Sequence, residues 1–359
     1  MAIPADYPII DPHIHQWDLA NTPRVLSLPK KLLGWNRSLY EGIVNLAAKK
    51  ADRDYVGKVD YVGYDYLPQH YAQDTAQLTI THAVHVEAKW MAKKPLEVVD
   101  ETRWVAQIFD SANNNTGIKL GGIVGYTELR DPQAAQILKA HKEASDRLVG
   151  IRQMLAWDDD KGIMRYCDRP KIYQDATWRK NFALLEAMNL SFDAWFFHHQ
   201  LDEMVELANA FPKVNFMLCH MGTPIGVAGP FASYGHSEKN RREIYQQWQE
   251  GMAKVAECKN VSVKLSGFFM PVVGWGMHSD NPLNPQQVFD RFKPMVDFVI
   301  EQFGVDRCLF ASNFPMDKVS LSLQTLYELY WQISEPYSEQ DKKKLFFTNA
   351  ARFYKIPIS

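Results

Sequence analysis

The chain has 359 residues, 46% of them hydrophobic, so it can bury a large core and suits one barrel with insertions as well as two smaller domains. Its formal net charge is -2, its pI is near 6.6, and Lys and Arg are scattered, which argues against a nucleic-acid or membrane partner. No apolar run approaches the roughly 20 residues of a transmembrane helix. We expect a small-molecule partner and prefer a single domain over residues 1–359.

The cysteines and the N-terminus bear on the cellular compartment. The four cysteines lie far apart and form no C-x-x-C pair: Cys167, Cys219, Cys258 and Cys308. The first six residues lack the basic segment and apolar core of a signal peptide. Both observations predict a reduced, cytoplasmic protein.

Apolar runs typical of β-strands alternate with helical patterns along the chain. Eight such runs occur, at residues 8–14, 81–88, 118–128, 148–154, 190–197, 214–220, 261–266 and 307–312. Between them, apolar residues recur at helical spacing, for example in 201–211 and 288–303. Eight strands, each followed by a helix, predict an α/β fold of the (β/α)8 barrel type, in which reactive groups gather at the C-terminal strand ends.

The connection between the first two predicted strands is much longer than a βα unit requires. Roughly 65 residues, 16–80, stand where one short loop and a helix are expected. The segment is too aromatic for a disordered linker, so we interpret it as a lid. Enlarged loops, 222–242 and 268–278, follow strands six and seven on the same barrel face. Together the three segments predict a deep aromatic pocket, and the alternative is an interface between copies in a homo-oligomer.

Polar residues stand at the C-terminal end of nearly every predicted strand. His13 and His15 are two residues apart, so in a strand both side chains point to one face and can converge on one ligand. The remaining strand ends carry, in chain order, His85 with Glu87, Glu128, Arg152, His198 with His199, His220, Lys264 and Asn313. A structural hydrogen bond could explain any one of them, but a complete ring of polar ends indicates an active site.

The motifs at these strand ends resemble those of the amidohydrolase-related family of TIM-barrel hydrolases. The likeness is to the branch that contains sugar-lactone and pyrone-dicarboxylate lactonases, with aromatic-acid decarboxylases as more distant relatives. It spans nearly the whole chain, in the segments 10–17, 85–88, 150–153, 191–193, 198–201, 220–222, 263–267 and 310–317. The resemblance implies a hydrolase and is less specific for the substrate.

Asn313 departs from the pattern that the resemblance implies. Metal-dependent members place an aspartate there, which binds the metal and takes a proton from the attacking water. An amide has no basic lone pair near neutral pH, so another group must accept the proton. The candidates are His220, Asp317 and His198, of which the first two rank level. The alternative role for Asp317 is a cap for a helix that begins near Ser320.

The same departure bears on the cofactor. His13, His15 and His198 could supply three nitrogen ligands to one divalent metal, zinc or manganese, with an open position for water. A site without the carboxylate holds a dication less tightly. The resemblance also implies that some lactonases of this branch work without metal. The metal is therefore bound at these three histidines and required, bound but dispensable, or absent.

The reaction that we predict is the opening of a small lactone by water, in the catabolism of aromatic or sugar acids. His13, His15 and Arg152 would stabilise the negative charge that builds on the carbonyl oxygen. Arg152 would also bind a carboxylate of an acidic substrate, unless it forms a structural salt bridge. Lys264 could bind substrate or, equally well, form an ion pair with an acidic side chain in the barrel mouth. We assign catalysis to His220, Asp317, Asn313 and Arg152, and substrate binding to Arg152, His85, Lys264, Trp17 and His199.

Two other functions compete with the lactonase. A metal-dependent, non-oxidative decarboxylase of an aromatic or enoic acid uses the same fold, but it normally needs the aspartate that Asn313 replaces. A catalytically silent barrel that acts as a binding protein would also explain the lost aspartate, although the histidines and Arg152 remain. Release of acid without carbon dioxide from a lactone would favour the lactonase.

Overall fold

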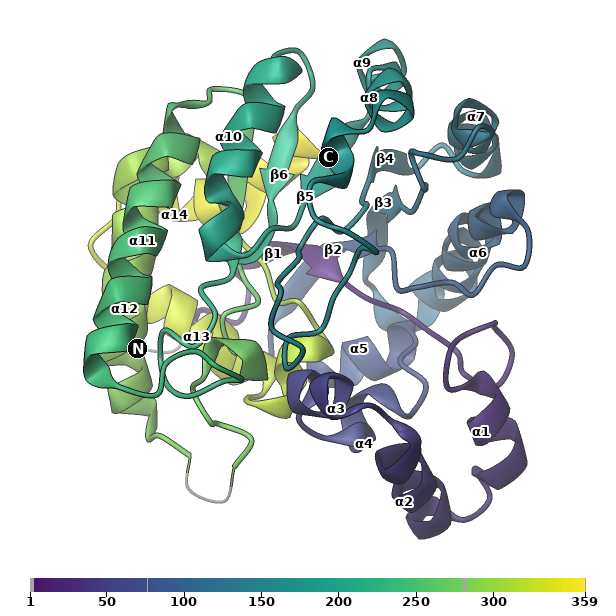
Figure 1. Ribbon diagram of the computed structural model, residues 1–359, viewed down its shortest axis with the longest axis horizontal. Coiled ribbons are helices and arrows are strands. Elements are labelled where there is room, and N and C mark those ends of the chain that lie inside the picture. Colours follow the sequence, from purple (N-terminus) through teal and green to yellow (C-terminus); the bar gives the residue numbers. More distant parts are fainter. Residues whose placement is uncertain (1–2, 76, 280–281, 359) are drawn as a thin grey trace.

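A computed structural model describes residues 3–75, 77–279 and 282–358 of the chain. Its eight parallel strands form one sheet in chain order (Figure 1): β1 (Pro8–Ile14), β2 (Thr79–Val86), β3 (Lys119–Gly125), β4 (Leu148–Ile151), β5 (Ser191–Ala194), β6 (Phe216–Leu218), β7 (Val261–Leu265) and β8 (Cys308–Phe310). The sheet curls until its ends meet, since the His15 amide donates to the Phe314 carbonyl at 2.8 Å and the Asn313 amide donates to the His13 carbonyl at 2.9 Å. The predicted (β/α)8 barrel is confirmed.

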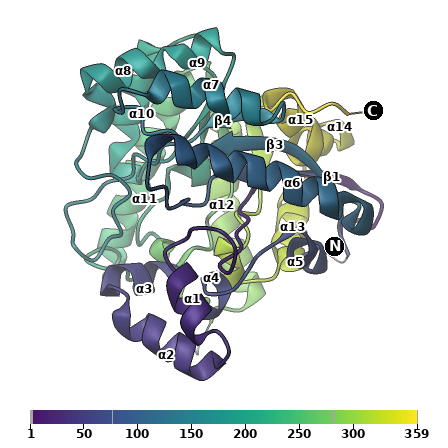
Figure 2. The same ribbon diagram turned by 90° about the vertical axis from the view of Figure 1, so that its right-hand side faces the viewer.

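Helices surround the barrel and connect its strands (Figures 1 and 2). They are α6 (Val99–Thr116), α7 (Ala134–Ala144), α8 (Ala176–Phe182), α9 (Leu184–Ala187), α10 (Leu201–Ala210), α11 (Glu238–Glu257), α12 (Pro285–Phe303), α13 (Leu323–Ile333), α14 (Glu339–Lys343) and α15 (Asn349–Phe353). The helical periods predicted in 201–211 and 288–303 correspond to α10 and α12. Their apolar stripes cover the outside of the sheet.

Several strands end earlier than the apolar runs predict. β5 stops at Ala194, although the run extends to Phe197. Trp195, Phe196 and Phe197 are nevertheless buried, at 4% exposure or less. Apolar residues beyond the hydrogen-bonded ladder therefore pack into the core as loop, and a run of apolar residues reports burial rather than strand pairing.

In its described residues, 16–75 and 77–80, the insertion between β1 and β2 forms five helices: α1 (Ser27–Leu33), α2 (Arg37–Ala47), α3 (Lys50–Val56), α4 (Val59–Val62) and α5 (Pro68–Asp74). Figures 1 and 2 show α1 to α4 as a group beside the barrel, joined to it at both ends of the segment. A bridge closes the insertion at its base, where Trp17 and Tyr66 exchange backbone hydrogen bonds of 3.0 and 2.9 Å. The hydroxyl of Tyr55 on α3 contacts Met270 Sδ, in the loop after β7, at 3.1 Å.

The remaining expectations concern the surface and the compartment. Within the described residues, no helix has both the length and the apolar character needed to span a membrane. The four cysteines form no disulfide. The cytoplasmic location and the homo-oligomer stay predictions. Large apolar side chains are exposed on α1, α2 and the turn between them, namely Leu28, Leu32, Trp35, Leu39, Ile43 and Leu46.

Candidate active site

A cavity of about 750 Å³ opens between the C-terminal ends of the strands and the insertion. Residues just beyond five strands line its floor: His15, Glu87, Arg152, His220 and Asn313. Its other side is lined by α1 to α4 and the loops that join them, through apolar residues such as Val44 and Val56. Trp17 also lines the cavity, as its predicted role in substrate binding requires. The predicted metal ligands His13 and His198 do not line it.

A second polar group lies inside the barrel beside the cavity floor, and we call it the inner cluster. Its members are His13, Asp193, Cys219, Lys264 and Tyr354, all fully buried. Lys264 Nζ donates to Asp193 Oδ2 at 2.6 Å and contacts His13 Nδ1 at 3.3 Å. The Tyr354 hydroxyl donates to Asp193 at 2.9 Å, and Cys219 Sγ lies 3.9 Å from the same carboxylate. The carboxylate is thus fully engaged within the cluster.

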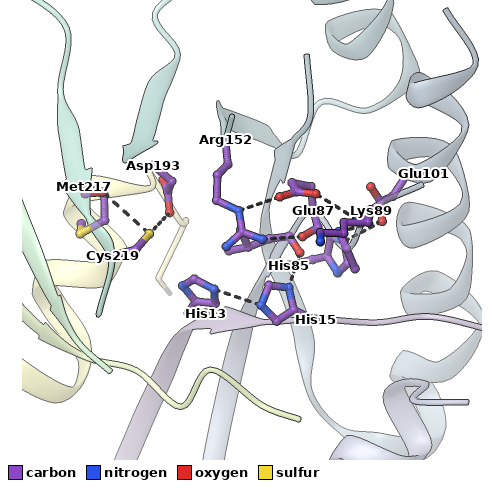
Figure 3. Close-up of polar contacts among 12 residues, drawn as sticks. His13, His15, His85, Glu87, Lys89, Glu101, Arg152, Asp193, Met217 and Cys219 are labelled. Atoms are coloured by element: carbon purple, nitrogen blue, oxygen red, sulfur yellow. Dashed lines mark hydrogen bonds and ion pairs between the residues drawn. The ribbon is translucent and has the colours of Figure 1, made fainter. Parts of the chain in front are cut away.

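His13 connects the inner cluster to the cavity floor. Its Nε2 lies 3.2 Å from His15 Nε2, a contact drawn in Figure 3. His15 Nδ1 lies 2.8 Å from the Val86 carbonyl oxygen. Burial, followed by the nearby Lys264 charge, holds the pKa of His13 well below its usual value. Burial and then Arg152 do the same for the pKa of His15. Both rings are neutral near pH 7.

His220 reaches the cavity through an unusual turn after β6. Its backbone is left-handed, with φ of 57°, and Gly267 after β7 also has a positive φ of 64°. A Cβ on Gly267 would lie 2.3 Å from His220 Nδ1, so only glycine leaves room for the ring. His220 Nδ1 hydrogen-bonds the Ser266 hydroxyl at 3.0 Å. This hydrogen bond orients the ring, and Nε2 has no hydrogen bond to any described residue.

Arg152 occupies the cavity floor with its guanidinium fixed by Glu87. Nε donates to Glu87 Oε1 at 2.8 Å and Nη2 donates to the Glu87 carbonyl at 2.8 Å, as Figure 3 shows. The pair is almost fully buried, which confirms the alternative of a structural salt bridge, whereas binding of a substrate carboxylate by Arg152 stays a prediction. The salt bridge exists, and Nη1 has no partner among the described residues. The guanidinium is therefore held rigidly, with one donor group left for a substrate oxygen.

Asn313 and Asp317 form a pair at the end of β8. Asn313 has a left-handed φ of 58°, which asparagine tolerates better than most residues, and its Nδ2 donates to Asp317 Oδ1 at 3.0 Å. Burial raises the pKa of Asp317 from 3.8 to about 7. Asp317 does not line the cavity, whereas Asn313 does. Nor does Asp317 cap a helix: the cap of α13 is Ser322, whose side chain accepts from the Thr325 amide.

Four predicted site residues lie elsewhere. β5 ends before His198 and His199, so the chain turns away and neither histidine lines the cavity. His198 Nδ1 accepts from the Ile225 amide at 3.3 Å, burial lowers its pKa to about 3, and His199 Nε2 contacts the Trp157 carbonyl oxygen at 3.1 Å. The His85 side chain points out of the barrel, not into the cavity: its Nε2 lies 3.7 Å from Glu101 Oε1 on α6 (Figure 3). Lys264 belongs to the inner cluster, so its pairing alternative is correct.

Known proteins share this architecture. The family model described as Amidohydrolase matches residues 10–356. The chain belongs to the amidohydrolase family.

Individual relatives of this amidohydrolase are distant. It is 29% identical to an uncharacterized protein of Sinorhizobium fredii over 98% of this chain and 100% of that protein. It is 25% identical to the L-fucono-1,5-lactonase of Burkholderia ambifaria over 83% of this chain and 88% of the lactonase. Among solved structures, a zinc-bound amidohydrolase from Burkholderia multivorans superposes with a TM-score of 0.69 at 20% identity, covering 98% of this chain and 100% of that one.

Whether this amidohydrolase fits a divalent metal can be judged from its own donor atoms. Of the predicted set, His13 and His15 lie together, with their Nε2 atoms 3.2 Å apart, but His198 does not line the cavity and joins no cluster of ligand atoms among the described residues. Among the described residues, the ligand atoms of His13, Asp193 and Cys219 lie within 4.8 Å of one another, all buried, and in composition such a group could hold a divalent ion. However, the Lys264 ammonium lies in the same place. With this cation in position, the residues do not fit a metal, because a dication would meet a fixed positive charge.

Some residues of the site escaped the sequence analysis. Lys89, three residues beyond the end of β2, lines the cavity, and its Nζ lies 4.9 Å from the Tyr166 ring centroid. It makes no ion pair with any described residue. Asp193 and Ser266 belong to recognised motifs, but nothing in their spacing predicts Lys264 or His220 as partners. The positive φ of Lys89, 55°, has no signature in the sequence either.

Proposed function

We propose that this amidohydrolase opens a small lactone that carries a carboxylate group. The observation that carries the proposal is the charge of the cavity. Seven basic residues line it against two acidic ones, Asp52 and Glu87; the basic residues are Arg24, Lys49, Arg53, Lys58, Lys89, Arg152 and Arg165. A concave, largely apolar site with an excess of fixed cations favours an anionic ligand. The similarity to a lactonase, at 25% identity, supports the choice of ring ester.

The cavity floor supplies the groups that lactone hydrolysis requires. Water attacks the ring carbonyl, and the unpartnered Nη1 of Arg152 stabilises the oxyanion that forms. His220 Nε2 accepts the water proton while Ser266 accepts from Nδ1–H. The carbonyl then re-forms, the ring carbon–oxygen bond breaks, and His220 returns the proton to the leaving alkoxide. The product is a hydroxy acid. His13 and His15 contribute no oxyanion donor, since their nitrogens bond to each other and to neighbours.

We assign recognition of the carboxylate to Lys89. Its ammonium is unpaired within the described part of the chain and lies in the wall of the same cavity as Arg152. A charged hydrogen bond of this kind contributes about 1.5 to 3 kcal/mol. Arg152 is already bonded to Glu87, which suits it to the reacting carbonyl rather than to a second anion.

The insertion acts as a lid in this proposal. Its helices α1 to α4 and the loops that join them line the cavity with apolar side chains such as Val44 and Val56 and with charged ones, Lys49, Asp52, Arg53 and Lys58. Movement of these helices would admit substrate and then exclude bulk water during the reaction. Replacing residues 24–60 by a short Gly-Ser linker should therefore raise KM more than it disturbs folding of the barrel.

A panel of lactones tests the proposal. Purified protein is given sugar-acid lactones with and without a second carboxylate, and acid release and carbon dioxide are recorded together. We expect acid without carbon dioxide, with carboxylate-bearing lactones preferred. Carbon dioxide from an aromatic or enoic acid would identify the decarboxylase instead. Tight binding of lactones without turnover would identify a binding protein and overturn the proposal.

A further inference from the structure

The inner cluster places a lysine at the convergence point of three metal-type ligands. His13, Asp193 and Cys219 each direct a donor atom to one buried region. Lys264 Nζ lies there, at 2.6 Å from Asp193 Oδ2 and 3.3 Å from His13 Nδ1. Its side chain and that of Asp193 are fully buried. A buried ammonium persists only when an anion and hydrogen-bond acceptors surround it, and this one has both.

Hydrogen-bond chemistry then fixes the protons of two histidines. An ammonium only donates, so His13 Nδ1 must accept from Lys264 and His13 carries its proton on Nε2. His15 Nε2 must accept that proton's hydrogen bond, which leaves the proton of His15 on Nδ1. A proton on His15 Nδ1 agrees with the last contact, because the Val86 carbonyl oxygen, 2.8 Å from Nδ1, can only accept a hydrogen bond. No other pattern satisfies all three contacts.

We propose that Lys264 is a built-in cation that occupies the place of a divalent metal among His13, Asp193 and Cys219, so that the enzyme works without a bound metal. Lys264 is at the same time a positioning residue, because it sets the ring tautomers of His13 and His15. The metal and tautomer claims stand apart from the choice of substrate. They would hold for any reaction in the cavity.

The proposal has two physical consequences. Zinc binds imidazole through a lone pair, and in this arrangement the lone pairs of both rings are already used. In addition, a dication a few ångströms from the ammonium would be strongly repelled in a buried site. Removing the ammonium should therefore expose a latent metal site made of His13, Asp193 and Cys219, in which the metal would neutralise the orphaned Asp193 carboxylate.

The first experiment uses the intact wild-type protein. Nitrogen-15 labelling of histidine and two-dimensional NMR report which ring nitrogen carries the proton. We expect the Nε2–H form for His13 and the Nδ1–H form for His15, and signals of both that stay unchanged when one equivalent of Zn²⁺ is added. Stoichiometric Zn²⁺ binding that shifts the His13 and His15 signals would overturn the proposal, as would the Nδ1–H form of His13.

The second experiment uses Lys264→Ala, with Lys259→Ala, an exposed lysine just before β7, as the matched control. Titration with Co²⁺ should produce the near-ultraviolet thiolate absorption of a cobalt–cysteine bond in Lys264→Ala only, with affinity more than about 100-fold above that of wild type. The band should vanish in Lys264→Ala/Cys219→Ala. A folded Lys264→Ala that binds Co²⁺ no better than wild type would refute the proposal. If the variant does not fold even with metal, the wild-type NMR result decides.

Discussion

The inner cluster and the cavity floor lie side by side in one barrel, but their polar atoms are satisfied in different ways. In the inner cluster, Lys264 and Asp193 bond to each other and to buried neighbours. On the cavity floor and wall, three nitrogen atoms have no hydrogen-bond partner among the described residues: His220 Nε2, Arg152 Nη1 and Lys89 Nζ. Saturated groups hold a site in shape, whereas unsaturated groups that face a cavity bind substrate. This contrast separates positioning residues from catalytic ones.

His220→Asn should give the largest effect on the cavity side. Loss of the general base should lower kcat by about two to four orders of magnitude with little change in KM. Burial and then Arg152 hold the pKa of His220 well below its usual value, so wild-type kcat should stay constant as pH falls from 8 to below 6. Steady-state kinetics on the best lactone of the panel measure both. A variant with wild-type kcat would remove His220 from the mechanism.

Gly267→Ala should reproduce part of that loss without touching a catalytic group. The new Cβ would collide with His220 Nδ1, and the left-handed φ adds strain of about 1 to 3 kcal/mol. We expect kcat to fall by roughly tenfold or more, since a displaced base loses its alignment. Thermal unfolding and kinetics measured together separate the two effects. Gly304→Ala, also at positive φ but with no atom within 4 Å of its Cβ, controls for backbone strain.

Lys89→Met should weaken binding of the anionic substrate. Removing a charged hydrogen bond worth about 1.5 to 3 kcal/mol raises KM by roughly ten- to a hundredfold. The effect should disappear for the corresponding lactone without the carboxylate. Lys94→Met, on the exposed surface outside the cavity, is the matched control. An equal rise in KM for both substrates would mean that Lys89 does not recognise the carboxylate.

Asp317→Asn should have the smallest catalytic effect, because Asp317 does not line the cavity. Its effect should appear in stability. Burial raises the pKa of Asp317 from 3.8 to about 7, so between these values the folded state holds a proton that the unfolded state has released. The free energy of unfolding therefore falls as pH rises through this window, by about 2 to 3 kcal/mol between pH 5 and 7. Urea unfolding of both proteins should show this fall reduced in the variant; parallel curves would contradict it.

The sequence predicts the barrel well because its signals are local. Each strand is a short apolar run, each helix has its own period, and parallel strands bring their C-terminal ends to one face. His15, Arg152, His220 and Asn313 could be grouped for that reason. The length of 16–80 likewise shows that an insertion must fold there.

The wrong predictions arise where a shift of one residue in a strand end or in the alternation of side chains changes which face a residue occupies. The apolar run that ends in Trp195 to Phe197 does not reveal that β5 stops at Ala194, so the sequence wrongly predicts His198 and His199 at a strand end in the site. His85 stands between Val84 and Val86 in β2, and because side chains alternate along a strand it points to the opposite face of the sheet, toward α6. The pairing of Lys264 with Asp193 and His13 crosses the barrel interior, and such a contact depends on register around the whole sheet, which no local spacing encodes.

A crystal structure with the hydroxy acid product of the best lactone bound tests the contrast between the cavity floor and the inner cluster most directly. We predict that the product lies in the cavity, with a newly formed carboxylate oxygen at Arg152 Nη1, the second carboxylate at Lys89 Nζ, and His220 Nε2 within hydrogen-bond reach of the hydroxyl. The inner cluster should remain closed, with Lys264 still bonded to Asp193. A product that contacts Lys264 or His13 instead would contradict the account.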